Sequence, residues 1–199
     1  MGSGYINCNI LKKTYSVFKS IVDDSLTEVT ADMLNGATSI SSYAFYQCAN
    51  LTSVEIPSSV TSIGSYAFEY CRNLTNITIP NSVTNIGSEA FSNCSALTSI
   101  VIPSSVTSIN YRTFSSCSAL SSVTIPSSVT SIGSSAFRDC SVLASVTVEA
   151  TTPPTLGSYA FYGTHANLVI YVPAGSVDTY KSASGWSTYA SRIQAIPST

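Results

Sequence analysis

The 199-residue sequence predicts a solenoid of stacked repeats, in which each repeat of about 23 residues adds one coil and one short parallel strand. An Ala-Phe pair recurs along the chain, once as Thr-Phe, and its Phe advances by 23, 23, 23, 23 and 24 residues. A cysteine follows three residues after each of the first five Phe, and a segment L-x-x-[IV]-x-[IV] follows each cysteine. The Phe are Phe45, Phe68, Phe91, Phe114, Phe137 and Phe161, and the cysteines are Cys48, Cys71, Cys94, Cys117 and Cys140. Agreement at this many positions over five units indicates a repeat protein.

Each part of the unit A-F-x-x-C-x-x-L-x-x-[IV]-x-[IV]-P-x-S-V-[TS]-x-I-[GN] has a predicted local structure. The segment L-x-x-[IV]-x-[IV] alternates apolar and small polar residues, which is typical of a strand with one buried face. The proline after it ends the ladder, and V-[TS]-x-I forms a second extended piece. We expect positive φ at Gly64, Gly87 and Gly133, with Asn110 substituting at the equivalent place. The segment A-F-x-x-C is too short for a full helix and predicts a single α or 3₁₀ turn.

The recurring Phe and Cys side chains are predicted to form a structural core ladder. In-register stacking places each repeat position above its equivalent, so the five cysteines form one column of buried, free thiols. An odd-numbered column offers no natural disulfide pairing, and the short ligand spacings of a metal site are missing. The role of Cys8, outside the column, stays open.

The ends of the chain depart from the repeat, and we expect them to cap a single domain of 199 residues. Residues 1–25 are predicted to be an N-terminal helical cap, with an amphipathic helix over 10–23, although a membrane-surface helix is an alternative for this stretch. Residues 26–150 hold the repeats, and 151–199 hold an irregular last repeat and a C-terminal cap. There we expect a short helix over 176–183, with Trp186, Tyr189 and Ile193 closing the last coil.

The composition excludes several classes of function. Charged residues make up 9% of the chain and the net charge is -2, which argues against the basic surface that nucleic acid requires. No apolar run reaches the length of a membrane span, and residues 1–9 lack the features of a signal peptide. We expect no catalytic residues, no cofactor and no metal, because His165 is the single histidine and no phosphate-binding loop is present. Glu69 and Glu89 occupy offset positions of neighbouring repeats and are expected to be solvated.

The repeat unit resembles the Treponema pallidum-type leucine-rich repeat of BspA-like bacterial surface proteins. The resemblance covers about residues 26–173, and the tail from Ile170-Tyr171-Val172-Pro173 to Trp186 and Ile193 resembles the closing segment of such proteins in gut bacteria. It implies a right-handed, curved leucine-rich-repeat solenoid with a strand on the concave side of every coil. It also implies a cell-surface or secreted location and adhesion to proteins or other bacteria, but no fixed binding residues.

The turns around Ala-Phe are the predicted binding region. The outward strand positions carry mostly Ser and Thr, whereas the turns carry tyrosines, which provide large contact area with a polar tip. We expect Tyr43, Tyr46, Tyr66 and Tyr70 to form a partner-binding edge; alternatively, these rings only shield neighbouring turns. The sequence therefore predicts a monomeric, non-catalytic binding or adhesion module for a protein or glycan. The alternative is a structural or spacer element of a larger surface or phage-like assembly, without a specific small ligand.

Overall fold

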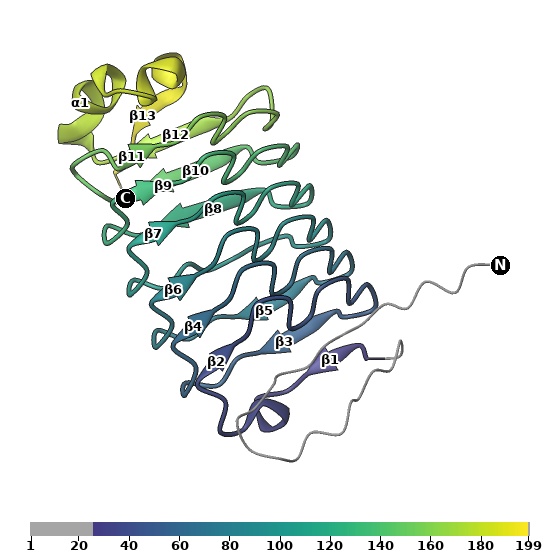
Figure 1. Cartoon of the computed structure of the whole chain (residues 1–199). Helices are drawn as coiled ribbons and strands as arrows, with labels where there is room; N and C mark the ends of the chain where they lie inside the picture. The colour runs from purple at the N-terminus through teal and green to yellow at the C-terminus, as the bar shows by residue number, and fades with distance from the viewer. Residues whose placement is uncertain (1–25, 199) are drawn as a thin grey trace.

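The computed structural model describes residues 26–198 and shows a solenoid of stacked coils with a helical segment at its C-terminal end (Figure 1). Most coils contain two short strands, separated by the turn that begins at the proline of the repeat unit. The first strands are β1 (Glu28–Val29), β3 (Ser53–Glu55), β5 (Asn76–Thr78), β8 (Ser122–Ile125), β10 (Ser145–Val148) and β12 (Val169–Val172). The second strands are β2 (Ser39–Ile40), β4 (Ser62–Ile63), β6 (Asn85–Ile86), β7 (Ser108–Ile109), β9 (Ser131–Ile132) and β11 (Thr155–Leu156).

The strands pair in parallel, each with the strand at the same place in the next coil. The first strands form the sheets β1-β3-β5 and β8-β10-β12, and β13 (Ile193–Ala195) extends the second of these sheets. The coil between these two sheets has no first strand, and its Val101 forms an isolated parallel bridge with Thr124 of β8. The register is in phase, as in the pairing of Val54 with Ile77, so equivalent repeat positions form columns. The predicted solenoid of short parallel strands is confirmed.

The Phe column runs through the interior as a continuous stack. Six rings, from Phe45 to Phe161, lie at centroid separations of 5.0, 5.3, 5.5, 5.4 and 5.6 Å, and all are buried. Leu, Val and Ile of the strands complete this core. Because the four inner rings each lie between two others, the core is a property of the stack and not of a single repeat.

The cysteine column has a hydrogen-bonding role that the sequence did not indicate. The Sγ atoms of Cys71, Cys94, Cys117 and Cys140 lie 3.0, 3.2, 3.2 and 3.1 Å from the carbonyl oxygen of the Phe in the preceding coil. Burial raises the pKa of Cys71 and Cys140 to about 12 and the pKa of Cys94 and Cys117 well above the ordinary value, so these four thiols stay protonated donors.

Cys48 departs from the expected column of free thiols. It is buried like the others, but it is disulfide-bonded, whereas Cys71, Cys94, Cys117 and Cys140 are free. The expectation of a free thiol is therefore wrong for the first member of the column. Cys48 belongs to the first full coil, where the column has no earlier cysteine in the repeat pattern.

Many of the abundant Ser and Thr side chains connect successive coils. The chain contains 39 Ser and 22 Thr, and many of their hydroxyls donate to a carbonyl oxygen of the preceding coil. Such bonds run from Thr52 to Thr27, Thr75 to Thr52, Ser82 to Val60, Ser105 to Val83, Ser118 to Ser95 and Ser128 to Val106. The hydroxyls therefore do more than occupy exposed positions, because they satisfy backbone acceptors along the stack.

The repeated glycines allow the backbones of successive coils to approach closely, and they do not adopt positive φ. Gly64, Gly87 and Gly133 are absent from the positive-φ residues, so that expectation is wrong. A Cβ on Gly64 would overlap the backbone nitrogen of Ser42 in the preceding coil. Asn110 also lacks positive φ; its Nδ2 donates to the carbonyl oxygen of Ile86 at 2.6 Å, where the glycines of other coils use their backbone N–H.

Aromatic side chains of the C-terminal segment cover the last coil. This segment comprises the 3₁₀ helix η2 (Ala174–Ser176), α1 (Val177–Ser182), the 3₁₀ helix η3 (Trp186–Arg192) and β13. Trp186 Nε1 donates to the Pro154 carbonyl and Tyr180 Oη to the Ala150 carbonyl, both at 2.7 Å. Trp186 also lies 6.2 Å from the Phe161 ring, so it continues the aromatic interior. At the other end, a 3₁₀ helix η1 (Asp32–Leu34) follows β1, and the expected N-terminal cap over 1–25 lies outside the described residues.

Candidate functional site

The turn around Ala-Phe forms one long edge of the solenoid, and its backbone has an alternating conformation. In the first such turn, the N–H groups of Tyr43, Phe45 and Gln47 donate to carbonyl oxygens of the next coil, at 3.0, 2.7 and 2.8 Å. The intervening N–H groups of Ala44, Tyr46 and Cys48 donate to the residue three positions earlier in their own coil. The expected α or 3₁₀ turn is therefore replaced by an alternating pattern, because every second N–H pairs with the neighbouring coil.

This alternation requires two residues per coil in the left-handed region, and their side chains line the edge. We call this surface the turn edge and divide it into three columns by position in the repeat. The first outer column holds Tyr43, Tyr66, Glu89, Arg112, Ser135 and Tyr159, and the second outer column holds Gln47, Tyr70, Asn93, Ser116, Asp139 and Gly163. All twelve have φ between 50° and 70°. The middle column, between them in sequence, holds Tyr46, Glu69, Ser92, Ser115, Arg138 and Tyr162.

Bulky side chains at these positions are costly. A left-handed conformation disfavours a residue with a Cβ by about 1–2 kcal/mol, and glycine and asparagine are the usual occupants. Here tyrosine occupies four such positions, at φ of 62° for Tyr43, 60° for Tyr66, 62° for Tyr70 and 60° for Tyr159. The fold explains the backbone conformation but not the choice of tyrosine.

The four tyrosines that the sequence singled out lie together. Tyr43 and Tyr66 stack with centroids 4.7 Å apart and planes 9° from parallel. Tyr46 meets Tyr43 edge-on at 5.6 Å and Tyr70 edge-on at 6.0 Å. They form a contiguous aromatic cluster at the N-terminal half of the turn edge, where Tyr43 is 49% exposed.

A carboxylate is buried within this cluster. Glu69 lies in the middle column, flanked in its own coil by Tyr66 and Tyr70, and is only 7% exposed. Among residues 26–198, no side chain or backbone group donates a hydrogen bond to its carboxylate. Burial and the nearby charge of Glu89 raise the pKa of Glu69 to about 7, against a lowering effect of Arg112. The expectation that Glu69 is solvated is therefore wrong for most of the residue, of which only 7% is exposed.

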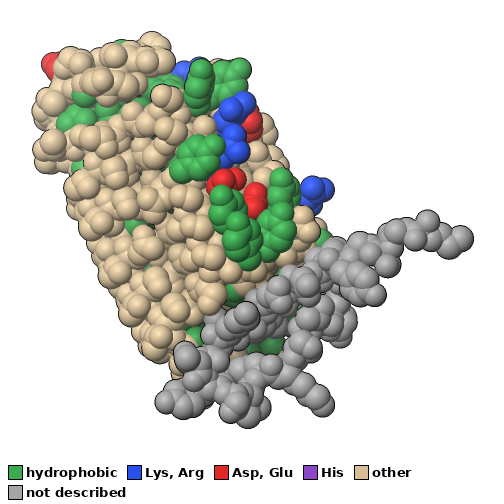
Figure 2. Space-filling model, in the orientation of Figure 1, with side chains coloured by type: hydrophobic (Ala, Val, Ile, Leu, Met, Phe, Trp, Pro, Cys, Tyr) green, Lys and Arg blue, Asp and Glu red, His purple; other side chains and the backbone are tan. Residues whose placement is uncertain are grey.

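The other charges of the turn edge are paired or lie against tyrosine rings. Arg112 Nη1 lies 4.0 Å from Glu89 Oε2, and Arg138 Nε lies 3.2 Å from Asp139 Oδ2. Guanidinium groups lie over tyrosine rings at three places: Arg72 on Tyr70 at 5.5 Å, Arg112 on Tyr111 at 5.1 Å and Arg138 on Tyr162 at 5.4 Å. Figure 2 shows these side chains gathered along one edge of the molecule, beside a broad surface that is mostly uncharged.

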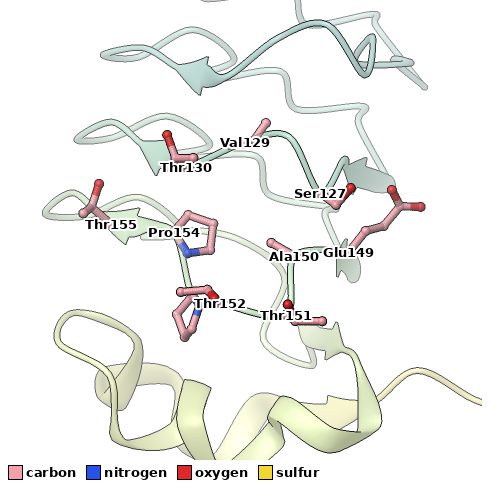
Figure 3. Close-up of a pocket in the computed structure, with 10 residues that line it drawn as sticks. Ser127, Val129, Thr130, Glu149, Ala150, Thr151, Thr152, Pro154 and Thr155 are labelled. Atoms are coloured by element: carbon pink, nitrogen blue, oxygen red, sulfur yellow. The ribbon is translucent and has the colours of Figure 1, made fainter.

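A pocket of about 330 Å³ lies at the irregular last repeat, where 151–154 replace the regular turn (Figure 3). Hydroxyl groups, prolines and one carboxylate, that of Glu149, line it. The lining residues are Ser127, Val129, Thr130, Glu149, Ala150, Thr151, Thr152, Pro153, Pro154 and Thr155. The backbone carbonyls of Ala150 and Pro154 accept bonds from the C-terminal cap, and Glu149 is the single ionisable residue among those that line the pocket.

The described part of the chain contains no grouping suited to metal binding. No three His, Cys, Asp or Glu side chains converge within residues 26–198, and His165 Nδ1 accepts a bond from the Asn167 N–H in an exposed loop. None of the helices in that range has the length and apolar character needed to cross a membrane. The aromatic and charged turn edge is thus the candidate functional site.

In-phase parallel ladders, a buried leucine at one position of each repeat and a Phe spine define the class as a leucine-rich-repeat solenoid. The family model described as "BspA type Leucine rich repeat region" matches residues 38–168 in six copies, and the chain belongs to this family. Proteins of this family are generally non-enzymatic binding modules.

Solved structures agree with this assignment. The crystal structure of a Treponema pallidum leucine-rich-repeat protein is 35% identical, with a TM-score of 0.64 over 74% of this chain and 69% of that chain. A leucine-rich cell surface protein of Faecalibacterium prausnitzii A2-165 is 24% identical, with a TM-score of 0.57 over 89% of this chain and 56% of that chain. The pneumococcal vaccine antigen PcpA is 16% identical, with a TM-score of 0.56 over 79% of this chain and 42% of that chain. The latter two show similarity of fold alone. A comparison with curated proteins found no match.

Sequence reasoning missed two features of the turn edge. It did not foresee the left-handed positions, although Asn93, Asp139 and Gly163 at equivalent places are residue types typical of that conformation. It also missed the burial of Glu69, for which the signal was its position between Tyr66 and Tyr70 in the repeat alignment.

Proposed function

We propose that this chain is a non-catalytic binding or adhesion module that recognises a protein or glycan partner through the tyrosine cluster of the turn edge. The observation that carries the proposal is the tyrosine at left-handed positions. Equivalent positions of other coils hold Ser, Asn, Asp, Gly, Gln, Glu or Arg, so the solenoid does not require an aromatic ring there. A bulky residue kept where it costs stability is typical of a functional surface.

The chemistry of the cluster suits macromolecular recognition. Tyrosine buries a large area with few rotatable bonds and retains a hydroxyl for hydrogen bonding, which limits the entropy lost on binding. The rings contact one another across coils, so the cluster is held in place before a partner arrives, which further reduces the cost of association.

We also propose a cell-surface or secreted location for the protein. Membership of the BspA-type family supports it, as does the name of the F. prausnitzii protein, a leucine-rich cell surface protein that shares the fold. Adhesion is the function that fits a rigid repeat surface displayed in this setting.

The test compares the purified wild-type chain with a variant in which Tyr43, Tyr46, Tyr66 and Tyr70 are all changed to Ser. Serine is chosen because Ser135, Ser115 and Ser116 occupy the equivalent positions of the three columns, so the fold accommodates it. Both proteins are applied to arrays of glycans and of surface-exposed host and bacterial proteins.

We expect saturable binding of the wild type to at least one arrayed molecule and loss of that binding in the variant. Binding that survives in the variant would place the site elsewhere on the solenoid. No saturable binding of the wild type at all would favour a structural or spacer element.

A further inference from the structure

The buried carboxylate of Glu69 has no counter-charge of its own in the turn edge. Arg112, which lowers the pKa of Glu69, lies 4.0 Å from the carboxylate of Glu89, and that carboxylate also interacts with the Tyr66 hydroxyl. Glu69 is more than nine-tenths buried and accepts no hydrogen bond from the described residues. The Glu69 oxygens nevertheless reach solvent, because among the described residues the buried side-chain polar atom without a hydrogen-bond partner is Arg112 Nε. A ligand that supplies positive charge and N–H groups can therefore meet the carboxylate at the surface.

We propose that the tyrosine cluster binds the ammonium group of a lysine side chain of a protein partner, placed over the Glu69 carboxylate between Tyr66 and Tyr70. This inference rests on the proposed function and specifies the ligand chemistry of the same site.

The tyrosine rings around Glu69 favour a cation independently of the carboxylate. An ammonium or guanidinium group within about 6 Å of an aromatic centroid is attracted by the negative face of the ring. Arg72, Arg112 and Arg138 already occupy such positions over Tyr70, Tyr111 and Tyr162, at 5.5, 5.1 and 5.4 Å. The turn edge thus holds cations on tyrosine rings within its own chain, and the Glu69 position combines such rings with an unpaired carboxylate.

Access to Glu69 selects the shape of the cation. Since only 7% of the residue is exposed, a ligand contacts it over a small area. Lysine carries a compact ammonium on a flexible four-carbon stem, and its methylene groups can pack against the tyrosines. The planar guanidinium of arginine and the ring of an amino sugar are broader, so the compact ammonium of lysine matches this small exposed area best.

Ionisation of Glu69 makes the proposed binding dependent on pH. The groups that face it are Glu89, which raises its pKa, Arg112, which lowers it, and Tyr46, Tyr66 and the buried Cys94, whose own pKa values it raises. With a pKa of about 7, Glu69 is mostly ionised at pH 8 and mostly protonated at pH 6. Lysine affinity should therefore fall about tenfold from pH 8 to pH 6, and binding near pH 7 should release a proton.

The experiment is an NMR titration of the full chain with a blocked Gly-Gly-Lys-Gly-Gly peptide. The same peptide with ε-acetyl-lysine, the Arg peptide and glucosamine serve as comparison ligands. Glu69→Gln removes the charge and keeps the shape of the side chain. Glu55→Gln, an exposed carboxylate on strand β3, is the matched control for a change of one charge. Circular dichroism verifies that both variants are folded.

We expect the lysine peptide to change NMR chemical shifts only in the coils that carry Tyr46, Glu69 and Ser92. The affinity for the acetylated peptide should be about tenfold weaker, and Glu69→Gln should weaken the affinity for the lysine peptide by the same factor. Glu55→Gln should bind like the wild type, and the pH dependence should disappear in Glu69→Gln. Lysine binding unaffected by Glu69→Gln, shifts elsewhere on the solenoid, or no binding of the lysine peptide would overturn the inference. Preferential binding of glucosamine or the Arg peptide would also overturn it.

The two proposals fail separately. A partner found on the arrays that is lost in the four-Tyr variant but retained by Glu69→Gln would leave the proposed function standing and reject the lysine site. Loss of that partner in both variants, with the pH dependence described, would support both.

Discussion

The strand face, which consists of the outward-pointing residues of the first strands, and the turn edge are built by the same repeat. They differ in the side chains that change from coil to coil. Outward positions of the first strands carry mainly small hydroxyl or amide side chains, with Val101, at 76% exposed, as an apolar exception. The turn edge carries Tyr, Glu and Arg at backbone positions that favour glycine or asparagine. The strand face repeats what stacking requires, whereas the turn edge contains costly side chains that stacking does not require, and this difference locates the candidate site.

The Phe spine supports both surfaces, so its disruption has the largest expected effect. Phe91 stacks between Phe68 at 5.3 Å and Phe114 at 5.5 Å and is fully buried. Phe91→Ala should lower the free energy of unfolding by about 3–5 kcal/mol, through lost burial and a residual cavity. Thermal and urea unfolding measure the change, and Val101→Thr on the exposed strand face is the control. A Phe91→Ala protein that melts within a degree of the wild type would contradict the assignment.

The turn edge should show a stability effect of opposite sign at Glu69. Its pKa of about 7 lies above the ordinary value of 4.5, so between these pH values the folded state holds a proton that the unfolded state has released. The free energy of unfolding therefore falls as pH rises through this window. Glu69→Gln should raise stability by about 1 kcal/mol at pH 8 and leave it unchanged at pH 4, since partial solvation screens the charge. A variant less stable than the wild type at pH 8 would show that the carboxylate is satisfied.

Hydroxyl groups on the strand side of the coil should matter for stability alone. Ser105 Oγ donates to the Val83 carbonyl oxygen at 2.6 Å, so Ser105→Ala leaves a part-buried acceptor with one bond fewer. We expect a loss of about 1 kcal/mol in urea unfolding and no change in partner binding. Ser104→Ala, at an exposed neighbouring position, provides the comparison. Equal behaviour of the two variants would deny these hydroxyls a role in joining coils.

Tyr66 in the turn edge should matter for partner binding and not for stability. Tyr66→Asn should change the free energy of unfolding by less than about 0.5 kcal/mol, because asparagine tolerates the left-handed conformation and this relief offsets the lost contact with Tyr43. Binding of the array partner should weaken. A large loss of stability would instead support rings that only shield neighbouring turns.

The spacing of 23 residues was sufficient to predict the solenoid, because Phe, Cys, Leu and Ile recur in a phase that only in-register stacking explains. The same periodicity brought Tyr43, Tyr46, Tyr66 and Tyr70 onto one surface. It could not predict the disulfide of Cys48 or the left-handed turns, since the repeat pattern offers Cys48 no partner and the turns depend on hydrogen bonds between coils. The burial of Glu69 was likewise hidden, because exposure depends on the packing of side chains from neighbouring coils.

We propose that partner binding belongs to the turn edge and not to the strand face. Surface plasmon resonance with a partner from the arrays separates these two surfaces, when it compares the four-Tyr variant with a strand-face variant that combines Glu55→Gln with Val101→Ser. We expect the four-Tyr variant to lose saturable binding while its unfolding midpoint stays unchanged, and the strand-face variant to bind like the wild type. Binding lost in the strand-face variant and retained in the four-Tyr variant would contradict this proposal.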